Sequence, residues 1–123
     1  MRRLFFGNSG GSGTNPIMTL TAVLLGGSEQ IGFLIFGGRP QPNGVFINGK
    51  KYNITQLLTN FQLNGGTAFS VLSFEGSVLP CNSVQLEING TAHTFTNNGK
   101  AYSNNDNIFE ENETYTIKLL STT

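Results

Sequence analysis

The chain has 123 residues, a hydrophobic share of 37% and a charged share of 11%, which is about half the usual charged share. Seven Lys and Arg balance seven Asp and Glu, which argues against duplex nucleic acid or an anionic membrane as the main partner. A single cysteine, Cys81, excludes an intramolecular disulfide, so one domain must hold together by its core. A surface with so little charge suits a protein that works inside an assembly.

The first sixteen residues combine a cationic, apolar tip with a linker rich in Gly and Ser. Two cations and three large apolar side chains at the end of a flexible chain have little reason to stay in water, so we expect the tip to bind a partner. We therefore expect residues 1–16 to form an N-terminal anchoring arm and linker before a domain over residues 17–123. The partner-binding residues of the arm are Arg2, Arg3, Leu4, Phe5 and Phe6.

A single arm is expected to bind weakly. Burying each of its three apolar side chains contributes about 1.5–3 kcal/mol, whereas ordering the tip costs roughly 1–2 kcal/mol per residue. Tight attachment therefore needs added backbone hydrogen bonds, as in strand addition, or several copies acting together. A flexible linker over residues 7–16 has an r.m.s. span of about 17 Å, enough to reach a neighbouring subunit. The alternative is a disordered end with no role.

The longest apolar stretch runs over residues 17–25 and is interrupted by Thr19 and Thr21. It is too short to span a bilayer. A secretion signal with Arg2 and Arg3 as its cationic region is an alternative, but its apolar part would lie behind the linker and lack a clear cleavage site.

Five Asn-Gly dipeptides divide the domain, and Asn-Gly is the leading dipeptide of the type I′ turns that join paired strands. Residues 83–88 alternate cleanly between apolar and polar side chains, as a half-buried strand does. The expected hairpins pair strands over 45–47 and 51–54, and over 83–88 and 91–96. The dipeptides are Asn43-Gly44, Asn48-Gly49, Asn64-Gly65, Asn89-Gly90 and Asn98-Gly99.

Four further strands are expected, and residues 55–60 fit a strand continuation or one helical turn. No segment has a sustained helical period. Short strands at this spacing are typical of a β-sandwich or small barrel, and we expect an all-β chain with a single antiparallel β-sandwich of seven to eight strands. The further strands cover residues 18–25, 31–36, 67–75 and 114–120.

Two blocks of the domain carry a skeleton of Gly-aromatic, Phe-Gly and Phe-x-Gly steps, and a Leu-Pro step follows in the second block. They contain Ile31-Gly32-Phe33, Phe36-Gly37-Gly38 and Phe46-Ile47-Asn48-Gly49, then Phe69 to Gly76, Leu79-Pro80 and Val84 to Thr91. In these steps, over about residues 18–120, the chain resembles a small repeat-type domain of tailed-bacteriophage structural proteins, such as tail-fibre and other virion proteins. The resemblance implies a virion structural role and supplies no catalytic residues.

The chain departs from that family pattern in two places. Its first loop carries Arg39 and two prolines, and no Trp occurs toward the C-terminus, where Phe109 would substitute.

With one histidine and one cysteine, the chain has few residues from which to build a metal site or a catalytic pair. His93 and Cys81 supply neither zinc spacing nor a ligand set, and they could form a thiolate–imidazole pair only if the fold joined them. We expect a buried Cys81 and a partly exposed His93 on a strand.

An oxygen-rich segment runs from Asn104 to Glu113 and includes Glu110 and Glu111. Such segments can hold calcium, but no EF-hand spacing is present, and no motif places a glycosidase carboxylate pair. We expect a solvated acidic turn. Tyr102 lies among polar residues and is the best candidate for an exposed, ligand-facing aromatic.

The sequence therefore favours a non-enzymatic bacteriophage virion structural protein, tail appendage or fibre-associated, or a capsid decoration, attached through its arm. We expect other virion proteins as partners and a homo-oligomer, for example a trimer, with no nucleic acid, membrane, cofactor or metal. The alternative is a carbohydrate-binding, host-adhesion module in which Tyr102 meets a host-surface glycan. A third hypothesis is a small hydrolase that uses Cys81 or the acidic segment.

Overall fold

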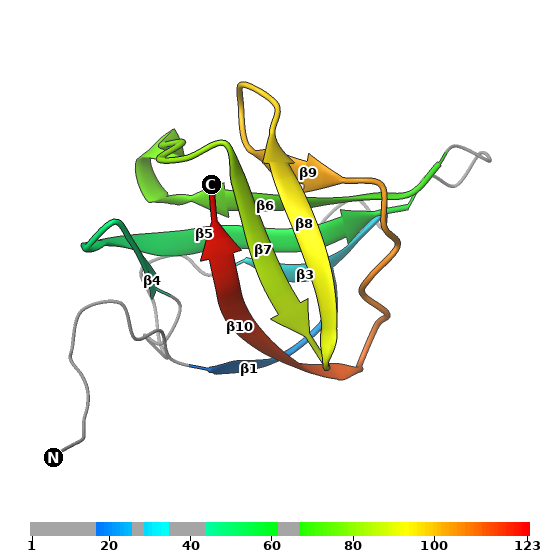
Figure 1. Cartoon of the computed structure of the whole chain (residues 1–123). Helices are drawn as coiled ribbons and strands as arrows, with labels where there is room; N and C mark the ends of the chain where they lie inside the picture. The colour runs from blue at the N-terminus through cyan, green and yellow to red at the C-terminus, as the bar shows by residue number, and fades with distance from the viewer. Residues whose placement is uncertain (1–16, 26–28, 35–43, 62–66) are drawn as a thin grey trace, which may run out of the picture.

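The computed structural model describes residues 17–25, 29–34, 44–61 and 67–123. These residues form ten strands, one 3₁₀ turn and no α-helix (Figure 1), which confirms the prediction of an all-β chain. The elements are β1 (Met18–Thr21), β2 (Val23–Leu25), β3 (Gln30–Leu34), β4 (Gly44–Ile47), β5 (Lys50–Asn60), β6 (Phe69–Phe74), η2 (Glu75–Ser77), β7 (Ser83–Ile88), β8 (Thr91–Asn97), β9 (Tyr102–Asn104) and β10 (Thr114–Thr122).

The strand count exceeds the expected seven to eight for two reasons. Ala22 divides the expected strand over 18–25 into β1 and β2, and the short β9 was not predicted. Residues 55–60 continue β5 as a strand, because this strand pairs with β3 and β6 on its two sides.

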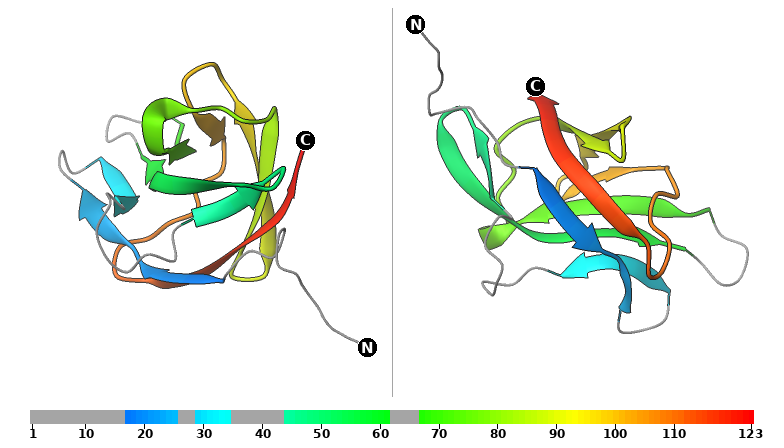
Figure 2. Two further views of the ribbon diagram at one scale, coloured as in Figure 1. Left: turned by 90° about the vertical axis from the view of Figure 1, so that its left-hand side faces the viewer. Right: turned by 90° about the horizontal axis from the view of Figure 1, so that it is seen from below.

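All strands belong to one antiparallel sheet, ordered β1-β10-β7-β8-β9-β6-β5-β3-β2, with β4 paired to β5 outside this path. The two end strands, β1 and β2, follow each other in the chain, so the sheet curls round and nearly closes into a barrel (Figures 1 and 2). Ala22, fully buried at this corner, donates its N–H to Glu113 O at 2.9 Å and accepts from Asn112 N at 2.8 Å. These bonds satisfy the backbone where the chain changes edge.

Two of the Asn-Gly dipeptides join hydrogen-bonded neighbours. Asn48 (φ 54°) and Gly49 (φ 80°) connect β4 to β5, and Asn89 (φ 49°) and Gly90 (φ 87°) connect β7 to β8. Both residues of each pair have the positive φ that a type I′ turn requires. The dipeptide Asn64-Gly65 lies outside the described residues.

The alternating side chains of β7 place every second residue in the core. Val84, Leu86 and Ile88 are 0–3% exposed, whereas the residues between them are half-buried on the other face. Aromatic rings pack together in the core: Phe109 lies edge-on against Phe33 and Tyr115 at centroid distances of 5.2 and 4.9 Å. Edge-to-face pairs of this kind add stability beyond their buried area, so a chain with few apolar residues still makes a dense core.

Candidate functional site

Tyr102 is buried, and the prediction of an exposed, ligand-facing aromatic at this position is wrong. Its side chain has no exposed surface and packs edge-on against Phe74 at 5.7 Å. The phenol donates a hydrogen bond to Cys81 O at 2.9 Å and accepts one from Cys81 N at 3.1 Å. The reason is the position of β9, which lies between β6 and β8; the polar sequence around Tyr102 does not reveal this pairing.

Stability is expected to fall at alkaline pH because of Tyr102. Burial, opposed by the hydrogen bond to the Cys81 backbone, raises the pKa of Tyr102 from 10.0 to about 12. The raised pKa favours the neutral phenol in the folded state, so its contribution is complete below pH 10 and is lost as the pH rises toward 12. The free energy of unfolding should fall by up to about 1.4 kcal/mol per pH unit in this window. Urea unfolding at several pH values measures the slope, and Tyr102→Phe should lose this part of it. An equal slope in both proteins would contradict the assignment.

The structure keeps Cys81 and His93 apart in their hydrogen bonding. Half-buried Cys81 donates its thiol to Ser83 O at 3.4 Å and lies 3.6 Å from the Tyr102 hydroxyl. His93 instead meets Asp106, with Nδ1 2.8 Å from Oδ2 and side-chain exposures of 17% and 51%. Among the described residues no contact joins the thiol to the imidazole. Cys81 and His93 therefore each bond to a different neighbour, and the described contacts do not place the thiol beside an imidazole base.

The acidic segment bears out the expectation of a solvated turn. Glu110, Glu111 and Glu113 are exposed. Asn104 Oδ1 accepts from Asp106 N at 3.0 Å, so this side-chain oxygen supports the turn. No group of three or more His, Cys, Asp or Glu side chains in the described part of the chain is arranged to hold a metal ion.

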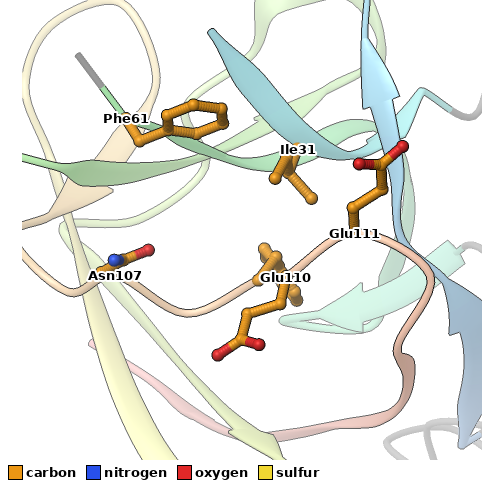
Figure 3. A pocket seen from close by; sticks show the side chains of 6 residues that line it. Ile31, Phe61, Asn107, Glu110 and Glu111 are labelled. Carbon is orange, nitrogen blue, oxygen red and sulfur yellow. The ribbon is translucent and has the colours of Figure 1, made fainter. Parts of the chain in front are cut away.

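A hollow of about 340 Å³ opens beside this segment. The segment that carries Asn107, Glu110 and Glu111 runs opposite Ile31 and Phe61, and the two glutamates leave it in different directions (Figure 3). The hollow therefore has apolar surface between carboxylates. Its lining residues are Ile31, Phe61, Asn107, Phe109, Glu110 and Glu111.

Two buried hydroxyls fasten the lining segment to the sheet. Ser70 Oγ donates to Asp106 O at 2.7 Å, so the Thr59 hydroxyl, 2.7 Å away, donates to Ser70. Thr59 Oγ1 in turn accepts from the backbone N–H groups of Ile108 and Phe109 at 3.2 and 3.1 Å. Both hydroxyls belong to fully buried residues. Each of the two hydroxyls both donates and accepts a hydrogen bond, which holds the segment in one position over the sheet.

The rest of the hollow is held by backbone contacts from distant segments. Ile31 lies directly opposite Thr59 in the pairing of β3 with β5. Phe61 N donates to Glu29 O at 2.9 Å, and Glu110 N donates to Tyr115 Oη at 2.7 Å. No pattern in the sequence indicated this hollow, because its wall combines β3, the end of β5 and the segment after β9.

The charges of the described residues are uneven. All seven acidic side chains lie in the described ranges, with only four lysines, so this part carries three more negative than positive charges. Lys50 and Lys51 begin β5, at the opposite end of that strand from Phe61. Neither the Glu110 nor the Glu111 carboxylate has a hydrogen bond or ion pair with another described residue. The hollow is therefore an acidic, apolar surface open to a cationic, apolar ligand.

The predicted binding residues Arg2, Arg3, Leu4, Phe5 and Phe6 lie outside the described residues. None of the described residues belongs to a helix long and apolar enough to cross a membrane. Comparisons with models of protein families, with curated proteins and with solved structures found no match to this chain.

Proposed function

We propose that the chain is a non-enzymatic structural protein of a bacteriophage particle, a tail-appendage or capsid-decoration component attached through its N-terminal arm. The proposal rests on the resemblance in the sequence, and the observation that supports it most is where the glycines and Asn-Gly pairs of the two resembling blocks fall. Asn48-Gly49, Gly76 and Asn89-Gly90 all have positive φ at the ends of strands. The family skeleton marks strand ends and turns, and these residues occupy such places here.

The fold suits a particle component. We propose that the domain is a small β-sandwich, in which opposite parts of the nearly closed sheet form two layers that pack face to face. The single cysteine leaves the domain to bury its core without an intramolecular disulfide, and the chain is rich in neutral polar residues. Such a domain can be added to a particle by a separate arm without changing its own fold.

Two observations favour the structural role over its rivals. The glycan-binding hypothesis needed an exposed Tyr102, and this ring has no exposed surface. The hydrolase hypothesis used Cys81 or the acidic segment, and the Cys81 thiol bonds to the Ser83 carbonyl and lies beside the Tyr102 hydroxyl, with no base among its hydrogen-bond partners in the described part of the chain. We therefore favour the structural role.

Deletion of residues 2–13 is expected to remove the protein from phage particles. The deletion removes the cationic and apolar side chains together with most of the linker, so the particle-bound amount should fall by about tenfold or more, equivalent to at least 1.4 kcal/mol of attachment. Mass analysis of purified particles measures the bound amount. A control that keeps the arm's length but replaces residues 2–6 by Gly and Ser should behave like the deletion.

Two outcomes would change the proposal. If the shortened protein stays on the particles, the attachment surface belongs to the domain and not to the arm. If the intact protein never occurs on particles, the virion role is wrong.

A further inference from the structure

The hollow beside Glu110 and Glu111 continues onto an open edge of the sheet. β2 is the last strand in the sheet order, and among the described residues no other strand pairs with its outer side. Leu24 of β2 lies directly opposite Ile31 in the register of β2 with β3, so the two side chains share a face. Leu24 is 43% exposed. The apolar surface of the hollow therefore extends to an edge that can accept a further strand.

An open strand edge presents unpaired backbone N–H and C=O groups, and an extended peptide can pair with them. Val23 and Leu24 are both more than 40% exposed on this edge. An added strand would thus gain backbone hydrogen bonds and apolar contacts together. These backbone hydrogen bonds would supply the binding free energy that burial of the three apolar side chains of the tip does not supply by itself.

The chain contains a segment of the matching chemistry. Arg2 and Arg3 precede Leu4, Phe5 and Phe6, and the hollow offers two carboxylates beside Ile31, Phe61 and Phe109. Side chains alternate in direction along an extended chain, so neighbouring arginines diverge, as the two glutamates do in Figure 3. The described residues carry an excess of three negative charges, which two arginines per arm would largely offset.

We infer that the hollow and the free edge of β2 together bind the arm, Arg2 to Phe6, of a second copy of this chain. The chain enters β1 at Met18 and reaches the hollow's side only at Ala22, which bonds to Glu113 and Asn112. The arm therefore leaves the domain at the far end of β1, about 13 Å away at the rise of a strand. To reach the hollow of its own domain, the arm would have to turn back along β1. A linker with an r.m.s. span of about 17 Å can reach the hollow of a neighbouring copy without that reversal.

The inference rests on the anchoring role proposed for the arm, but its test needs only the purified full chain, so its failure leaves attachment to particles to be judged separately. Two variants reverse the charges on the two sides: Arg2→Glu with Arg3→Glu, and Glu110→Lys with Glu111→Lys. Sedimentation of the unmodified chain should show association. Each variant alone should associate about tenfold more weakly, because two exposed ion pairs become repulsive. An equimolar mixture of the two should recover association, since reversed arms meet reversed hollows.

The control changes the same total charge elsewhere: Glu75→Lys with Glu87→Lys should associate like the unmodified chain. Glu110→Gln with Glu111→Gln provides a milder test if the lysine variant fails to fold, and it should also weaken association. A monomeric unmodified chain would overturn the inference, because the arm then binds its own domain or something else. Unchanged association in either charge-reversed variant, or no recovery in the mixture, would overturn it equally.

Discussion

Replacing Thr59 by Val is expected to lower the free energy of unfolding by about 2–4 kcal/mol. Val has nearly the shape of Thr but no hydroxyl, so the N–H groups of Ile108 and Phe109 lose their acceptor. Ser70 would also lose the donor that now satisfies its oxygen. A buried N–H without a partner costs about 1–3 kcal/mol, and the change removes the acceptor of the buried Phe109 N–H and of the part-buried Ile108 N–H.

The same change should loosen the segment that lines the hollow. Equilibrium urea unfolding measures the stability, and hydrogen exchange of the Ile108 and Phe109 amides measures the local effect. Thr59→Ser keeps the hydroxyl and removes one methyl, so it should protect these amides nearly as well as the original residue. Loss of stability in Thr59→Val with no faster exchange at these two amides would contradict the role assigned to the hydroxyl.

Replacing Gly32 by Ala is expected to destabilise the domain by about 3 kcal/mol, at the upper end of the usual range for overpacking. A Cβ at this position would lie 2.4 Å from both Leu57 O and Leu58 Cα. These are backbone atoms of the paired strand β5, so no side-chain rotation relieves the overlap. β3 would have to move away from β5, and Ile31, which lines the hollow, would move with it.

Thermal unfolding tests this prediction, and the midpoint should fall by about 12–20 °C for a domain of this size. Gly49→Asn is the matched control, because a Cβ there has no atom within 4 Å and Asn tolerates the positive φ of the turn. It should change the midpoint by only a few degrees, about 4–8 °C at most. If Gly32→Ala behaves like this control, β3 and β5 can separate locally, and their close approach at Gly32 does not contribute to the stability of the domain.

These two changes also separate stability from assembly. Thr59 and Gly32 act through the sheet and the segment over it, whereas the charges of Glu110 and Glu111 act only at the surface. A charge-reversed variant that unfolds like the unmodified chain but no longer associates would assign the loss to the hollow itself. The same loss in a loosened Thr59→Val chain would show that the position of the segment matters for binding.

Much of the architecture can be predicted from the sequence because its signals are local. The alternation of β7 needs only six successive residues, and the turns at Asn48-Gly49 and Asn89-Gly90 need only the tolerance of two residues for positive φ. Strand pairing across these turns joins neighbours in the chain, so the register follows from the turn. The all-β class follows from the same signals repeated along the chain.

The remaining features depend on contacts between residues far apart in sequence. Tyr102 has polar neighbours in the chain, yet β9 lies between β6 and β8 and buries its ring. Most of the strands, the two Asn-Gly turns and the cationic, apolar composition of residues 2–6 can be predicted from the sequence alone. Contacts between distant strands determine which side chains are covered, that Ser70 and Thr59 fix the acidic segment, and that a hollow forms beside β3. Burial and hydrogen-bond partners arise when distant strands pair, and no short stretch of sequence contains that information.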